Sequence, residues 1–114
     1  MLITLPFLPI SVNQCYRTKN NRIYKSKKLI LFEKAVTEFF ENLEKFEMLK
    51  GNISIDITFE LKSSRKRDLD NLLKSLFDSS EGRIFDNDHQ IFEINCRKVH
   101  GCPHDKTIIN IGEM

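Results

Sequence analysis

The sequence predicts an α/β chain of the α+β kind, in which a mixed β-sheet is covered by two main helices. Residues 53–61 strictly alternate apolar and polar side chains, which is the pattern of a half-buried strand. Two segments, about 27–48 and 69–79, repeat their apolar residues at helical spacing. Since the chain has 114 residues, we expect one domain over residues 1–114.

The remaining elements are predicted to be short. Strands are expected at residues 2–5, 91–99 and 106–111, which gives the order strand, helix, strand, helix, strand, strand. Residues 11–25 show no clear period and are predicted to form a loop, with a short hairpin around Asn20-Asn21. The apolar positions assigned to the first helix are Leu29, Phe32, Val36, Phe39, Leu43 and Phe46, with Ser26 as its N-cap.

Composition excludes several classes of protein. A hydrophobic content of 40% with 30% charged residues is typical of a globular chain rather than a disordered one. No apolar run approaches the roughly 18 residues that span a bilayer, so we expect no membrane partner. The three cysteines form no Cys-x-x-Cys pair, which favours the reducing cytoplasm. No glycine-rich phosphate loop is present, so no nucleotide cofactor is expected.

Charge is unevenly distributed along a chain whose formal net charge is only +2. No acidic residue precedes Glu33, and a second basic cluster lies shortly before residue 68. Such clusters indicate a polyanionic partner, although two solvated loops would give the same pattern. The residues predicted to bind such a partner are Arg17, Lys19, Arg22, Lys25, Lys27, Arg65, Lys66 and Arg67.

Two aspartates at the start of the second predicted helix are the main candidates for chemistry. Asp68 and Asp70 directly follow three cations, and Lys74 lies one helical turn after Asp70. Converging carboxylates beside a basic surface can hold a hard divalent cation against a phosphodiester. The alternative is structural: Asp68 as an ordinary N-cap, and Asp70–Lys74 and Lys74–Asp78 as surface ion pairs.

A second acidic motif, Asp86-Asn87-Asp88, follows about twenty residues later. Taken alone it has the composition of a turn. That turn leads into the strand after the second helix, which would allow its carboxylates to approach the helix N-terminus.

Two further signals remain open. Cys96, His100, Cys102 and His104 are four metal-binding residue types, but their spacing matches no common zinc site, and a turn is the preferred interpretation. Asn13 either hydrogen-bonds within its own turn or contacts DNA.

Together these motifs resemble the RusA family of Holliday junction resolvases. The segment Arg67–Lys74 is similar to the family's core pattern Arg-Asp-Leu-Asp-Asn-x-x-Lys, and Ile84–Ile91 to its second motif. The N-terminal half is also similar, through Pro9–Asn13, Tyr16-Arg17 and Tyr24–Lys27. The resemblance covers nearly the whole chain.

The resemblance implies a homodimeric, Mg²⁺-dependent endonuclease, with Mn²⁺ as a substitute metal, that nicks two opposing strands of four-way junction DNA. The family is often encoded by phages and prophages. Carried over by position, Asp68, Asp70 and Asp88 match the catalytic metal ligands, and Lys74 matches the functional lysine. The family commonly has adjacent carboxylates in its second motif. Here Asn87 separates them, so Asp88, which keeps its offset from Gln90, is assigned as ligand and Asp86 is the fallback.

A mechanism can then be written in physical terms. A metal held by the three aspartates would activate a water and stabilise charge on the phosphate, with Lys74 as a compact cation beside it. Two other functions stay open: a non-catalytic architectural protein that binds junctions or other DNA, and a nuclease for other branched DNA.

Overall fold

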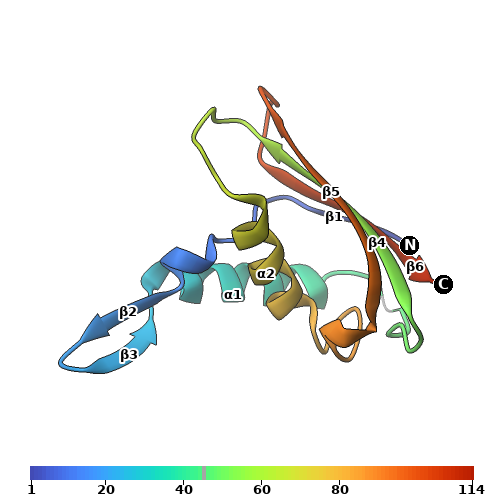
Figure 1. Cartoon of the computed structure of the whole chain (residues 1–114), viewed down its shortest axis with the longest axis horizontal. Helices are drawn as coiled ribbons and strands as arrows, with labels where there is room; N and C mark the ends of the chain where they lie inside the picture. The colour runs from blue at the N-terminus through green and yellow to red at the C-terminus, as the bar shows by residue number, and fades with distance from the viewer. Residues whose placement is uncertain (45) are drawn as a thin grey trace.

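The computed structural model describes residues 1–44 and 46–114. Its main sheet has four strands, arranged in the order β1 (Leu2–Leu5), β6 (Lys106–Glu113), β4 (Ile53–Leu61) and β5 (Ile91–His100). β4 pairs antiparallel with β6 and parallel with β5, so the sheet is mixed. Helices α1 (Lys27–Glu41) and α2 (Leu69–Ser80) lie on one side of it (Figure 1). The predicted fold class is confirmed.

β4 forms the centre of the core. The side chains of Ile53, Ile57 and Phe59 are fully buried, while the polar residues that alternate with the buried ones are only partly covered. Leu72 and Leu76 of α2 pack into the same cluster, because the helix places residues four apart on one face. Burial of these side chains fixes α2 against the sheet and therefore fixes the position of the aspartates at its start.

The first helix is shorter than predicted. The predicted range 27–48 includes residue 45, which lies outside the described residues, and α1 ends at Glu41. The side-chain amide of Asn42 donates to the carbonyl of Glu38, which closes the last turn. Leu49 instead donates its backbone N–H to the carbonyl of Ile84 at 2.9 Å. This long-range pairing requires extended backbone, and it overrides the helical spacing of Leu43 and Phe46.

A separate two-stranded hairpin, β2 (Tyr16–Lys19) and β3 (Arg22–Lys25), takes up much of the segment predicted to be a loop. The hairpin predicted around Asn20-Asn21 is confirmed: both residues have positive φ, 53° and 60°, as a two-residue turn between twisted strands requires. All residues of both strands are exposed. Figure 1 shows the hairpin projecting away from the sheet.

The other elements agree closely with prediction. α2 extends one residue beyond the predicted 69–79, and β5 one residue beyond 91–99. Two short 3-10 turns, η1 (Val12–Gln14) and η2 (Asp88–Gln90), precede the hairpin and β5. In the described part of the chain, no helix is long and apolar enough to cross a membrane.

Candidate active site

The start of α2 presents two exposed carboxylates. Asp68 occupies the N-cap position with extended backbone, but its side chain makes no capping hydrogen bond. Asp70 lies in the first turn, where one carboxylate oxygen accepts the N–H of Asn71 at 3.0 Å. The positive end of the helix dipole favours both negative charges. Asp68 therefore stands at the N-cap position, as the structural alternative expected, but the side-chain hydrogen bond of an ordinary N-cap is absent. Its carboxylate remains available to a ligand.

Lys74 lies one turn further along α2 and is also exposed. Its ammonium donates to Asp78 at 2.9 Å, and this bond raises the pKa of Lys74 above its ordinary value. The negative charges of Asp78, Asp88 and Glu81 raise it further. The ion pair Lys74–Asp78, considered from the sequence, is present. The other one, Asp70–Lys74, is not found among the ion pairs of the described residues. The fold brings the second motif to α2, because the backbone N–H of Asp88 donates to Glu81 at the end of that helix.

Gln90 explains how the second motif is held. It is buried, and its side-chain oxygen accepts the N–H groups of Asp86 and Asn87 at 2.9 and 3.0 Å. Its amide nitrogen donates to the carbonyls of Leu49 and Gly51 at 3.0 and 3.1 Å. One buried amide thus fixes the acidic turn to a distant segment of the chain.

The two aspartates of this turn have different surroundings. Asp86 forms an ion pair with Lys50 at 3.3 Å. The backbone N–H of Asp88 donates to Glu81 at 2.9 Å, which draws the turn toward the end of α2. Asp86 is therefore paired with a cation, whereas Asp88 takes part in no ion pair of the described residues. Sequence reasoning missed Glu81, whose role depends on a contact between two segments that no motif joins.

The donor chemistry of the site fits a hard divalent cation. Exposed aspartate oxygens are the ligands that Mg²⁺ prefers, and this ion usually takes only one or two protein carboxylates together with water and phosphate. In the described residues, no three acidic, histidine or cysteine side chains form a ready metal cluster, so Asp88 is not gathered with Asp68 and Asp70 into one. Asp68 and Asp70 can supply one or two ligands, and the remaining positions are left to water and substrate.

A basic loop, residues 62–67, leads from β4 into the site. Lys98 of β5 donates to the backbone carbonyl of Arg67 at 2.5 Å, which ties the loop to the sheet edge. Arg65 and Lys66 are exposed, and in the described chain no carboxylate pairs with them or with Arg67. These cations therefore remain available for phosphates.

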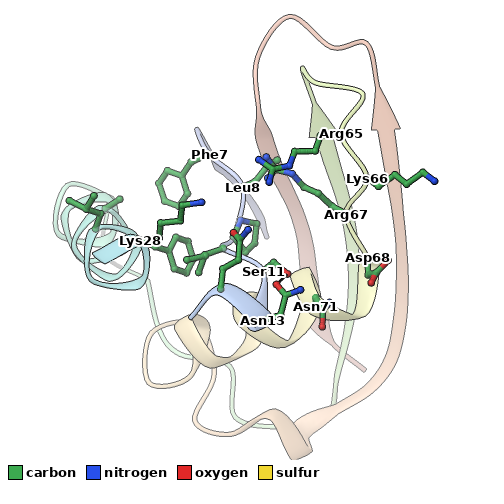
Figure 2. Close-up of a pocket in the computed structure, with 16 residues that line it drawn as sticks. Phe7, Leu8, Ser11, Asn13, Lys28, Arg65, Lys66, Arg67, Asp68 and Asn71 are labelled. Atoms are coloured by element: carbon green, nitrogen blue, oxygen red, sulfur yellow. Dashed lines mark hydrogen bonds between the residues drawn. The ribbon is translucent and has the colours of Figure 1, made fainter. Parts of the chain in front are cut away.

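The structure gathers only some of the predicted DNA-binding residues around the aspartates. A cavity of about 690 Å³ brings Asn13 together with Arg65, Arg67 and Asp68 (Figure 2). The hairpin cations Arg17, Lys19 and Arg22 lie apart, at the projecting end of the molecule in Figure 1. Lys25 pairs with Glu33 at 3.0 Å, and Lys27 is exposed at the first residue of α1.

The cysteine and histidine residues near the C-terminus are not gathered into a metal site within the described residues. The Nδ1 atom of His100 lies 3.0 Å from the carbonyl of Ser63, and the thiol of Cys102 donates to the carbonyl of Val99. Both groups serve local structure at the end of β5.

Hard-cation ligands and unpaired cations at one helix start are what an enzyme that cuts phosphodiesters requires. The comparison with protein families agrees. The family model "Endodeoxyribonuclease RusA" matches residues 6–111. The chain therefore belongs to the RusA family of endodeoxyribonucleases, and the resemblance found in the sequence is confirmed.

Two curated relatives are similar over most of their length. The crossover junction endodeoxyribonuclease RusA of Aquifex aeolicus (strain VF5) is 37% identical, over 80% of this chain and 74% of the relative. The protein of the same name from Enterobacteria phage HK97 is 33% identical, over 85% of this chain and 79% of the relative.

Proposed function

We propose that residues 1–114 act as one domain that resolves four-way DNA junctions by paired, symmetric, metal-dependent nicks. The observation that carries the proposal is the start of α2, where two exposed aspartates lie between a basic loop and Lys74, and where the side chain of Asp68 makes no capping hydrogen bond. The relatives are named crossover junction endodeoxyribonucleases, which supports a branched substrate.

Asp68, Asp70 and Asp88 are the proposed ligands of Mg²⁺, for which Mn²⁺ would substitute. When bound there, such an ion would supply an activated water and would stabilise negative charge on the scissile phosphate. Asp88 is preferred to Asp86 as the third ligand because Asp86 is paired with Lys50, while the charge of Asp88 acts on Lys74.

Lys74 is proposed to act as a cation rather than as a base. Its pKa is raised by the hydrogen bond to Asp78, so it keeps its proton to higher pH than a free lysine. A protonated ammonium beside the aspartates can neutralise charge that develops on the phosphate oxygens.

Two cationic surfaces are proposed to bind the DNA backbone. Arg65, Lys66 and Arg67 lie next to the cut, and the hairpin reaches further out. In the hairpin register Arg17 stands opposite Tyr24, and Lys19 opposite Arg22. Opposed residues of an antiparallel pair point to the same face, so three cations share one face of the ribbon. That face suits a phosphate backbone.

A homodimer is proposed because two equivalent sites related by a twofold axis match two symmetry-related strands of a junction. β5 is an edge strand of the sheet, and Phe92 and Ile94 on it are largely exposed. An open edge with exposed apolar side chains favours pairing with another chain. A cytoplasmic location is proposed from the three free cysteines and the DNA substrate.

The test uses an immobile four-way junction and a linear duplex of matched sequence, each with Mg²⁺ or EDTA. Paired nicks in the junction alone, abolished by EDTA and by Asp70→Asn while binding persists, are expected. Binding without cutting under every divalent condition would leave only an architectural role. Equal cutting of duplex and junction would retain the metal site and remove the specificity for junctions.

A further inference from the structure

The cavity beside the aspartates has two chemically different walls. Phe7 and Phe32 meet edge to face, with ring centroids 5.9 Å apart, and both line it. Leu31 of α1 also lines it, although 66% of this side chain is exposed. This exposed leucine contributes little to the core. Together with the partly exposed ring of Phe7, it gives the wall an apolar surface against which a nucleobase can pack.

The opposite wall is cationic and polar. Figure 2 shows the side chains of Arg65 and Arg67 turned toward one another and toward the side of the cavity formed by α1, whereas Lys66 extends the other way. Lys28 reaches in from α1, and the amides of Asn13 and Asn71 lie at the lower edge. This wall offers charges for phosphate and amide groups that can both donate to and accept from a base edge.

The cavity is continuous with the proposed catalytic site. Asp68 lines it, and Asn71 follows Asp70 directly on α2. A strand whose phosphate lies at Asp68 and Asp70 therefore has its neighbouring nucleotide at the mouth of the cavity. The volume of about 690 Å³ exceeds what one nucleotide needs and falls within the usual range of ligand pockets.

We propose that this cavity receives one unstacked nucleotide of the strand being cut, with its base against Phe7 and Leu31 and its phosphate held by Arg65 and Arg67. The inference rests on the proposed function and names a substrate subsite for it. Unstacking costs a few kcal/mol in a duplex and less where pairing is already disturbed. The branch point of a junction is such a place, so the cavity would favour cutting there over cutting in linear DNA.

In the experiment, the fluorescent base 2-aminopurine replaces each nucleotide that flanks the cut in a four-way junction, one position at a time. The full chain is added in EDTA, so that no strand is broken. Leu31→Glu puts a charge in the apolar wall. Ile30→Glu is the matched control, because Ile30 is also exposed on α1 but does not line the cavity. Both variants change the net charge equally and alter no buried side chain.

We expect fluorescence to rise about twofold or more at one flanking position with the unchanged chain and with Ile30→Glu, since an unstacked base is no longer quenched by its neighbours. Leu31→Glu should abolish the rise and lower the cutting rate in Mg²⁺ about tenfold. An equal rise with Leu31→Glu, or no rise at any position, would overturn the inference. So would conversion of a dimer to a monomer by Leu31→Glu in sedimentation, because the cavity would then be covered by a second copy.

Failure of the proposed function gives a different result. Junction cutting without any fluorescence change removes the nucleotide pocket and leaves the nuclease intact. A Leu31-dependent rise without cutting in any divalent ion supports the pocket and removes the catalytic proposal.

Discussion

β4 and the β2–β3 hairpin are both regular extended structure, but they are held by different forces. Alternate side chains of β4, among them Ile57 and Phe59, are fully buried. In the hairpin every residue is exposed, and its shape depends on cross-strand bonds and the Asn20-Asn21 turn. An isolated two-stranded hairpin is marginally stable in water. Hydrophobic burial thus explains the sequence of β4. The exposed cations and tyrosines of the hairpin are not explained by burial, and we propose that they serve an external partner.

The same contrast recurs within the candidate site. Gln90 is buried and makes four hydrogen bonds that shape the acidic turn, while Asp88 in that turn is exposed. Residues that build the scaffold are buried and satisfied, and residues proposed for chemistry are exposed on it. Substitutions should therefore separate stability from activity.

The largest difference in stability is expected between Phe59→Ala and Ile23→Ala. Phe59 is fully buried, so its truncation should lower the free energy of unfolding by about 3–5 kcal/mol. Ile23 is 75% exposed in the hairpin, and its truncation should change that free energy by less than about 0.5 kcal/mol. Urea denaturation followed by circular dichroism measures both. Similar losses would show that the hairpin packs against something in the free protein.

Replacement of Lys74 should lower activity without unfolding the chain. Lys74→Gln removes the proposed cation and is expected to slow junction cutting about 100-fold. Because the pKa of Lys74 is raised, the group stays protonated as pH rises through the range in which a free lysine begins to lose its proton. The cutting rate should thus show no dependence on deprotonation of Lys74 between about pH 7 and 9. A rate that rises with this deprotonation would make Lys74 a base instead.

Neutralising the cationic face of the hairpin should weaken DNA binding and spare the fold. Arg17, Lys19 and Arg22 changed together to Gln should lower junction affinity about tenfold or more, and reduce the slope of log affinity against log salt by up to roughly 2.7. Thermal unfolding should be unchanged, since all three side chains are exposed.

A single-charge comparison provides the control for this prediction. Arg22→Gln removes a cation at the hairpin turn, and Lys34→Gln removes an exposed cation from α1. In filter binding at several salt concentrations, the slope of log affinity against log salt should be smaller for Arg22→Gln and unchanged for Lys34→Gln. Equal slopes for the two variants would mean that only overall charge matters.

The last comparison concerns the two helix starts, where the expected changes in the free energy of unfolding are small. The hydroxyl of Ser26 accepts the N–H of Leu29 at 3.1 Å and donates to the carbonyl of Gln14 at 2.6 Å. Ser26→Ala should therefore lower the free energy of unfolding by about 1 kcal/mol. The side chain of Asp68 makes no capping hydrogen bond. Asp68→Ala should therefore change the free energy of unfolding by less than about 0.5 kcal/mol, while it abolishes cutting. A large loss of stability in the Asp68→Ala variant would show that Asp68 has a structural role at the helix start.

Periodicity predicted the elements that the core determines. The alternation in 53–61 and the spacing of Leu72 and Leu76 placed β4 and α2 almost to the residue, since burial imposes both patterns. The hairpin strands have no buried side, so no alternation in the sequence marks them. The asparagine pair predicted a short hairpin, but the extent of its strands was not predicted. The end of α1 depends on the pairing of Leu49 with Ile84, which local spacing cannot reveal.

The sequence predicted which residues the candidate site contains, but not how the two acidic motifs are arranged. The local motif around Asp68 and Asp70 placed both at the start of a helix. The approach of Asp88 to Lys74 depends on Gln90, which binds backbone about forty positions earlier, and on Glu81. Such contacts join distant segments and leave no periodic signal. They emerge only when the chain is folded.

The most direct test of the central claim is the Mg²⁺ dependence of junction cutting by Asp88→Asn and Asp86→Asn, two exposed aspartates in one turn. If Asp88 is a metal ligand and Asp86 belongs to the scaffold, Asp88→Asn should cut about 100-fold more slowly or need about tenfold more Mg²⁺. Asp86→Asn should remain within about threefold of the unchanged chain at every Mg²⁺ concentration. The reverse order of the two variants, or cutting that persists in EDTA, would contradict the account.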